Sequence, residues 1–246
     1  MSRLSKDRLL IGLAPAEMTV LRLRGVLKEK PIEKASVACD PAFGNEPWQG
    51  ALAALKSLQI AERCNVTVVL SNHFVRYAIV PWSNALGTAA EETAYIRHHF
   101  AKIHGERAKA WSLRATQSAA DAPRLASAID SALLAAMREA LQEKPLARLI
   151  SVQPQLMSKF NEWRKAIPAG GAWLVLAEPD RACVALHAEG RWRSVQNGKG
   201  AWRALLDRER HRVDGEIPNL VLIAGAAAPS NDADWQFREM SRAVSA

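Results

Sequence analysis

The first part of the chain alternates apolar and polar residues in the way that is typical of β-strands. Residues 8–13 form an apolar run and residues 18–24 alternate, so both segments are predicted to be strands, joined by a turn at 14–17. A third strand is predicted at 33–39. After a loop containing Pro, Gly and Asn, residues 48–63 carry leucines at helical spacing. The pattern therefore predicts three strands followed by a helix.

The middle of the chain continues with strands and helices. Residues 66–70 are apolar throughout, which suits a strand buried on both faces, and residues 73–80 are predicted to pair with them. Thr88 or a neighbouring residue can cap a helix that ends at Gly105. Further strands are predicted at 110–116, 125–129 and 146–152, and further helices at 132–141 and 154–165. This order is typical of an α/β layer.

A cluster of helix- and strand-breaking residues at 168–171, Pro-Ala-Gly-Gly, predicts a boundary between two lobes. We place the first lobe, with an inserted subdomain, at 1–168 and a shorter second lobe at 169–246. The second lobe is predicted to contain strands at 172–176, 182–187 and 191–195, a helix at 202–212 and a strand at 220–224. The order of elements at the start of the first lobe is thus repeated, although the sequence is not.

Composition narrows the classes of partner. Lys and Arg outnumber Asp and Glu by 33 to 25, which gives a net charge of +8. This charge favours an acidic partner, an anionic membrane surface or a nucleic acid. The basic residues occur as scattered pairs, without a compact run or a Phe/Tyr-rich strand motif, so we do not expect a nucleic-acid partner.

Cysteine usage and hydropathy indicate the compartment. Cys39, Cys64 and Cys183 are far apart, odd in number and next to apolar segments, which suits buried, reduced thiols. The longest uncharged apolar-rich stretches, such as 219–229, are about half of the roughly 20 residues needed to cross a bilayer. The N-terminus has no long apolar segment of the signal-peptide type. A cytoplasmic location is therefore expected.

Four segments carry a family resemblance: residues 9–13 followed by 19–23, residues 66–81, which end in Arg-Tyr-Ala-Ile-Val-Pro, residues 152–163, and residues 173–190. Together they resemble the PilM family of actin-like proteins from type IV pilus assembly. The first segment resembles that family's first hairpin, and the second its paired strands. Residues 152–163 resemble its last first-lobe strand and helix, and 173–190 its second-lobe hairpin. The resemblance implies an α/β, actin-like (ribonuclease H-like), two-lobed fold. With its abbreviated second lobe, the chain also looks like the cytoplasmic domain of the type II secretion L protein.

The nucleotide motifs of that family are altered in this chain. A phosphate loop of this kind needs an Asp for the metal–water shell and a Gly that lets backbone amides approach the phosphates. The matching positions here are Ala14 and Pro15 in the first turn, and Glu178 and Pro179 in the second. The Gly-rich adenosine loop is reduced to residues 224–228, with one glycine. We therefore expect no catalytic residue, no cofactor and no metal.

The resemblance implies a scaffold or adaptor. Its expected partner is the N-terminal cytoplasmic tail of an inner-membrane pilus or secretion assembly protein, or the assembly ATPase, with recruitment to the inner face of the inner membrane. We select Arg76, Tyr77, Trp82 and Arg97 as the partner-facing residues, because Trp and Arg are enriched at interface hot spots. Two alternatives stay open: an ATP-binding actin-like protein with a degenerate site, and a basic nucleic-acid-binding protein.

Other suggestive groups have simpler explanations. His98, His99 and His104 lack a Cys or acidic ligand at helical spacing, which makes a metal site improbable. Ser71 and His73 lie two apart, but no nucleophile-elbow motif surrounds them. The chain also has eight tryptophans. Four of them, Trp48, Trp163, Trp173 and Trp192, are predicted to lie in the core or between lobes.

Overall fold

The computed structural model describes residues 7–25, 30–117 and 121–240, and these residues divide into two compact units. The first unit comprises residues up to Phe74 together with Ser131–Ser158, and the second comprises Val75–Asp130 and Lys159–Arg242. Both units are discontinuous in sequence. Each is described by itself below.

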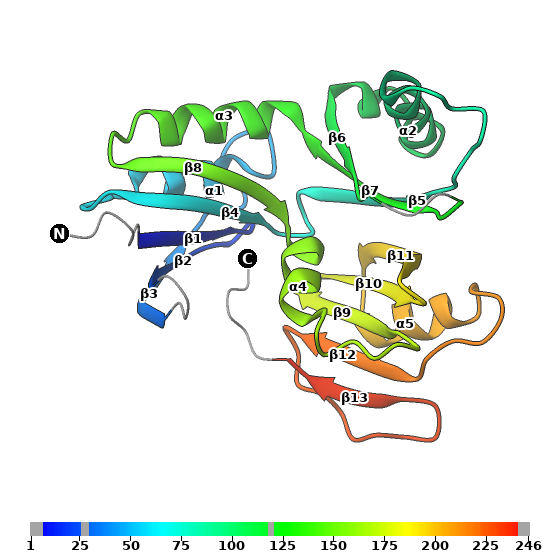
Figure 1. The fold of residues 1–246 in the computed structure, drawn as a ribbon. Coiled ribbons are helices and arrows are strands. Elements are labelled where there is room, and N and C mark those ends of the chain that lie inside the picture. Colours follow the sequence, from blue (N-terminus) through cyan, green and yellow to red (C-terminus); the bar gives the residue numbers. More distant parts are fainter. Residues whose placement is uncertain (1–6, 26–29, 118–120, 241–246) are drawn as a thin grey trace. The chain divides into compact units, whose positions relative to one another are not determined.

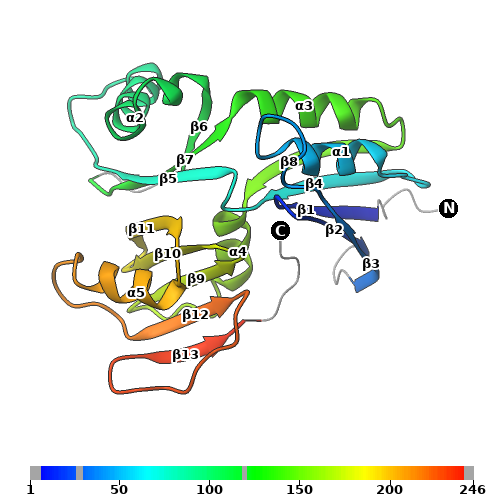
Figure 2. The same ribbon diagram turned by 180° about the vertical axis from the view of Figure 1, so that it is seen from behind.

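The first unit is a five-stranded sheet with helices α1 and α3 packed against each other (Figures 1 and 2). The strand order is β3-β2-β1-β4-β8. Its elements are β1 (Asp7–Leu13), β2 (Glu17–Arg24), β3 (Lys30–Ala38), α1 (Gln49–Ser57), β4 (Cys64–Leu70), α3 (Ser131–Gln142) and β8 (Ala147–Pro154). Ile11, Val66 and Val68 are fully buried in the two central strands, which explains their continuous apolar sequences.

The second unit contains a sheet with the same strand order, β11-β10-β9-β12-β13. Its elements are β9 (Ala172–Glu178), β10 (Arg181–Ala188), β11 (Arg191–Lys199), α5 (Trp202–Arg210), β12 (Leu220–Ala224) and β13 (Gln236–Glu239). Helix α5 packs on one face, where Leu206 joins the buried Trp173 and Trp235. Phe160, from α4 (Gln155–Trp163), lies 4.7 Å from the rings of His187 and Trp192, whose strand positions point to the opposite face.

A three-stranded sheet of order β5-β7-β6 completes the second unit. It consists of β5 (Val75–Val80), α2 (Ala89–His104), the short 3-10 helix η1 (Gly105–Ala110), β6 (Trp111–Ala115) and β7 (Arg124–Asp130). Ile96 and Phe100 of α2 pack on the buried alanines of β5 and β7. Strand β5 also contacts β11, where Asn197 Nδ2 donates a hydrogen bond to the Val75 carbonyl at 2.9 Å.

The structure confirms the predicted sequence of three strands, a helix and a strand in both sheets, but one predicted pairing is wrong. Residues 73–80 were expected to pair with 66–70, yet β4 pairs with β1 and β8, and β5 pairs with β7. The chain turns at Ser71, whose carbonyl accepts from Phe74 N at 3.0 Å. This turn directs β5 into a separate sheet.

Two element boundaries also differ from the sequence prediction. Helix α1 ends at Ser57, well before residue 63, because Leu58 adopts extended backbone angles and its N–H bonds to Leu55 O. Strand β13 is short and mostly exposed, so no apolar pattern indicated it. It pairs with β12 in parallel. In this pairing the backbone N–H of Gln236 donates a hydrogen bond to Asn219 O, and that of Met240 donates to Ile223 O.

Candidate functional site

The first turn at which an actin-like protein would hold phosphate is closed by its own hydrogen bonds. It lies between β1 and β2, where Ala14 N donates to Glu17 O at 2.9 Å. Pro15 has no N–H, and Ala16 O accepts from Cys39 N at 2.9 Å. Phosphate binding by a turn depends on backbone amides that point at the anion. At Ala14 and Pro15 this turn has no such amide to offer.

The second turn joins β9 and β10 through Pro179 and Asp180, and Asp180 has a positive φ of 60°. Proline again removes one amide donor. The nearby Gly225 has a φ of 86°, and a Cβ at this position would lie 1.8 Å from the Ala177 carbonyl oxygen. The single glycine of residues 224–228 is thus required for close packing of that loop against the end of β9.

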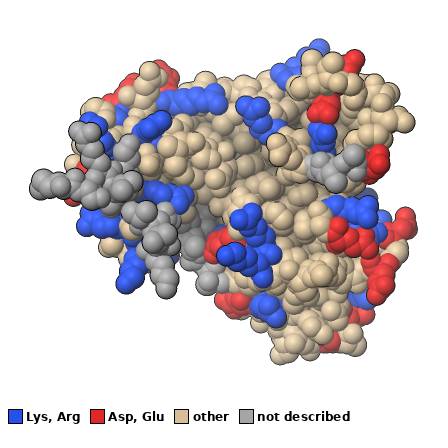
Figure 3. All heavy atoms as spheres, viewed as in Figure 1, with Lys and Arg blue, Asp and Glu red and all other residues tan. Residues whose placement is uncertain are grey.

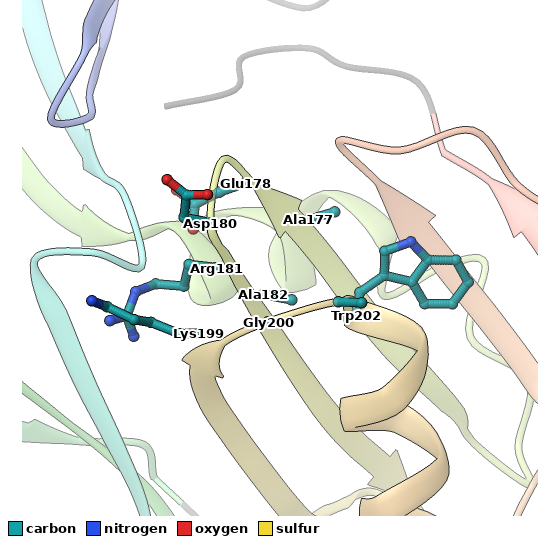
Figure 4. A pocket seen from close by; sticks show the side chains of 9 residues that line it. Ala177, Glu178, Asp180, Arg181, Ala182, Lys199, Gly200 and Trp202 are labelled. Atoms are coloured by element: carbon teal, nitrogen blue, oxygen red, sulfur yellow. The ribbon is translucent and has the colours of Figure 1, made fainter.

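A pocket of about 640 Å³ lies beside this second turn (Figure 4). Its lining residues are Ala177, Glu178, Asp180, Arg181, Ala182, Lys199, Gly200, Ala201 and Trp202. The side chains of Arg181 and Lys199 extend side by side, away from Trp202, and the carboxylates of Glu178 and Asp180 point in another direction (Figure 4). Arg181 stands directly opposite Lys199 on β11 and opposite Glu178 on β9. The pocket therefore combines two adjacent cations with two carboxylates.

Arg181 is held in place by a chain of hydrogen bonds. Its Nη1 donates to Asn197 Oδ1 at 3.2 Å, and Asn197 Nδ2 in turn donates to the Val75 carbonyl. The Arg181 Nε atom is buried and has no hydrogen-bond partner among the described residues. Sequence analysis did not select Arg181 or Lys199. The sequence signal was limited to Arg181, a cation directly after the predicted turn at 178–180.

Arg76 lies within electrostatic range of Arg181, and His104 lies within range of Arg76. Burial lowers the pKa of Arg76, and the neighbouring Arg181 charge lowers it further. Burial also lowers the pKa of His104, with a smaller contribution from Arg76. Positive groups from β5, β10 and the end of α2 therefore interact unfavourably with one another in this part of the second unit.

The structure places the four expected partner-facing residues in the β5-β7-β6 part of the second unit. Arg76 and Tyr77 are consecutive in β5, so their side chains point to opposite faces of the sheet, and both are half-buried. Trp82 follows β5 and is 38% exposed. Arg97 lies on α2 beside the buried Ile96 and is half-buried. Strand geometry thus separates Arg76 from Tyr77.

The remaining histidine and serine groups make contacts within the fold. Over residues 7–25, 30–117 and 121–240, no group of three or more His, Cys, Asp or Glu residues could hold a metal ion. His104 stacks on Phe100 and meets Trp111 edge to face. The Ser71 hydroxyl accepts a hydrogen bond from the backbone N–H of His73 at 3.1 Å.

The predicted core tryptophans and two of the three cysteines are buried. Trp48, Trp163, Trp173 and Trp192 are buried, as predicted. Cys64 and Cys183 are buried free thiols, but Cys39 is only half-buried, at the exposed end of β3. Burial raises the pKa of all three thiols.

A second pocket, near the turn between β10 and β11, contains arginines that are already paired. Arg212 donates to Glu209 at 3.0 Å, Arg191 to Glu189 at 3.2 Å, and Arg193 to the carbonyls of Asp214 and Glu216. On the face shown in Figure 3, Lys and Arg form several separate groups among acidic and neutral residues. Neither feature presents a continuous basic stripe of the kind that follows a nucleic-acid backbone.

Comparison with solved structures identifies the fold. The cytoplasmic domain of EpsL, an inner-membrane component of the type II secretion system of Vibrio cholerae, matches with a TM-score of 0.65 and 14% identity, over 96% of this chain and 90% of that chain. A Bacteroides thetaiotaomicron protein with an actin-like ATPase fold matches with a TM-score of 0.57 and 10% identity, over 92% and 86%. The PilM-PilN type IV pilus biogenesis complex matches with a TM-score of 0.58 and 14% identity, over 84% of this chain and 66% of that one.

These structural similarities establish that the chain has an actin-like fold, as the sequence predicted. No protein-family sequence model and no curated protein sequence matches it. Among the described residues, none of the helices combines the length and the apolar character needed to span a bilayer.

Proposed function

We propose that this actin-like chain is a non-catalytic scaffold in a machine of the type IV pilus or type II secretion kind. The observation that carries the proposal is the state of the two phosphate turns. Each contains a proline in place of an amide donor, and the Ala14 amide is bonded within its own turn. Tight phosphate binding needs several such donors at once, so their loss favours binding of a protein over turnover of a nucleotide.

The structural similarities suggest the kind of partner. The similar structures come from an inner-membrane secretion component and from a pilus complex of two proteins. For this chain we infer a cytoplasmic location and an inner-membrane assembly protein as partner, bound through its N-terminal tail, with the assembly ATPase as the other candidate. Of the four expected partner-facing residues, Trp82 has the most exposed side chain and is the best candidate for direct contact.

The first test is thermal unfolding of the chain with magnesium and millimolar ATP, in parallel with ADP. A ligand that binds only the native state raises the melting temperature by mass action. We expect no shift with either nucleotide and no ATP hydrolysis. A saturable shift of several degrees with ATP would instead support the alternative of a nucleotide-binding actin-like protein.

The second test concerns the partner. The tagged chain is used to capture proteins from detergent-solubilised inner membranes, and the captured proteins are identified by mass spectrometry. Trp82→Ala is expected to weaken binding of a pilus or secretion assembly protein about thirtyfold, and so to reduce its capture, since a hot-spot tryptophan contributes about 2 kcal/mol and every 1.4 kcal/mol is a factor of ten. Ile150→Ala, at an exposed apolar residue of the first unit, is the control. Equal loss in both variants would count against a specific role for Trp82.

A further inference from the structure

Two cations face each other across neighbouring strands beside the second turn. Arg181 of β10 and Lys199 of β11 are direct partners in the antiparallel register. Like charges directly opposite each other destabilise a sheet pair. Glu178 stands opposite Arg181 on β9, and its carboxylate compensates part of this repulsion. The three neighbouring residues Glu178, Arg181 and Lys199 still comprise two cations and one carboxylate.

The Arg181 guanidinium is also held in one orientation before any ligand binds, and not all of its N–H groups have hydrogen-bond partners among the described residues. Asn197 fixes one of its edges through Nη1, and Val75 fixes Asn197, so the side chain loses little freedom when a further group binds. The Nε atom is shielded from solvent and has no hydrogen-bond partner among the described residues. A buried donor without a partner costs free energy in the unbound protein. An anion beside the same guanidinium offsets part of that cost through its charge.

The neighbouring charges favour an anion with a single negative charge. Arg76 adds a third cation within electrostatic range of Arg181. Glu178 and Asp180 also line the pocket, and their carboxylates repel a doubly charged phosphate more strongly than a carboxylate. Pro179 leaves the turn without one of the amides that a phosphate would use. An arginine fork and a lysine match a carboxylate in both geometry and charge.

We propose that Arg181 and Lys199 form a binding site for the side-chain carboxylate of an acidic residue in the partner's tail. The site lies on the side of the β9-β10-β11 sheet that faces β5, where Asn197 contacts Val75, and α5 packs on the other face. This inference rests on the proposed scaffold function for the source of the carboxylate. The binding chemistry itself can be measured without the partner.

The test uses the full chain and two capped alanine peptides, one carrying a single glutamate and the other a glutamine at the same position. Binding is followed by the chemical shifts of the Asn197 side-chain amide and of the Lys199 backbone amide. The glutamate peptide is expected to bind saturably in the millimolar range and the glutamine peptide is not. Arg181→Gln and Lys199→Gln are each expected to weaken binding by about tenfold, since hydrogen bonds to charged groups are among the stronger ones.

Arg208→Gln is the charge-matched control, because Arg208 is exposed on α5. It should leave binding unchanged. The proposal is overturned if the glutamine peptide binds equally well, if Arg208→Gln weakens binding as much as Arg181→Gln, or if inorganic phosphate or ATP binds better than the glutamate peptide. The last outcome together with an ATP-induced melting shift would also contradict the scaffold function, whereas the first two would leave it intact.

A second readout needs no ligand. Since Lys199 stands opposite Arg181, Lys199→Gln should remove repulsion and raise the melting temperature at low salt by about 1–3 °C. The same change at Arg208 should have a smaller effect. A fall in melting temperature for Lys199→Gln would show that Lys199 stabilises the fold, and would contradict its assignment to a binding site.

Discussion

Individual residues with unusual backbone requirements shape the loops around the second turn. Gly225 has a positive φ and packs where a side chain would collide with the backbone of Ala177. Gly190, in the turn between β10 and β11, also has a positive φ of 75°, but its missing side chain would have open space. Alanine substitutions at Gly190 and Gly225 can therefore be compared, and the difference separates the free-energy cost of backbone strain from that of a steric clash.

Gly225→Ala is expected to destabilise the chain by about 2 kcal/mol or more, because strain and a backbone clash act together. Gly190→Ala should cost only about 1 kcal/mol, which is the usual penalty of the left-handed conformation. Denaturant unfolding of both variants measures the difference. Equal destabilisation would show that the loop at Gly225 can move away from β9 without further cost.

At the scale of elements, helix α2 shows how local sequence fixes a boundary. The Thr88 side chain accepts from Glu91 N at 3.2 Å, and the Glu91 carboxylate accepts from Thr88 N at 2.9 Å. This capping box satisfies two amides at the helix start. The bonds to Gly87 and Thr88 also lower the pKa of Glu91. The sequence around Thr88 therefore predicts where α2 begins, and Gly105 predicts where the helix ends.

Thr88→Ala should destabilise α2 and the sheet beneath it by about 1 kcal/mol, because it removes the side-chain acceptor of the cap. Thr93→Ala is the matched control on the same helix. Its hydroxyl bonds only to the Ala89 carbonyl within the helix, and alanine is the better helix former. Urea unfolding of the two variants should show a loss for Thr88→Ala and little change for Thr93→Ala. Comparable losses of unfolding free energy in the two variants would mean that the Thr88 cap stabilises the chain no more than the Thr93 hydroxyl does.

Strand pairing was less predictable than helix ends. Residues 73–80 have the apolar pattern of a strand, and that part of the prediction is confirmed by β5. The pattern says nothing about which strand lies alongside, because any edge with free amide and carbonyl groups can pair. Only the turn at Ser71 and the packing under α2 decide that β5 joins β7.

At the scale of the whole molecule, the chain crosses between the two units more than once. The segment 75–130 clusters with 159–242, and β5 contacts β11. A boundary after residue 168 stays a prediction, and it can be tested with a fragment that ends there. The fragment would keep the first sheet and the β5-β7-β6 sheet, but would lack β11 and the Asn197 contact with Val75.

In a fragment of residues 1–168, the amides of β5 and β7 are expected to exchange with solvent about tenfold faster or more than in the full chain, because neighbouring support is lost. The amides of β1 and β4 are internal controls, since the first unit keeps all of its strands. Hydrogen exchange with mass spectrometry makes the comparison. Equal protection of β5 in both proteins would show that the inserted segment folds without the second lobe.

The sequence by itself determined the α/β order of strands and helices, its repetition in the two sheets and the prolines at positions 15 and 179. These properties depend on apolar periodicity and on prolines, which act locally. The actin-like fold was implied by the family resemblance and is shown by the solved structures. Tertiary structure alone decided the pairing of β5 with β7, the addition of β13, and the meeting of Arg181 with Lys199 and Arg76. The physical reason is that these contacts join residues far apart in the chain, where strand register and sheet order set the distances.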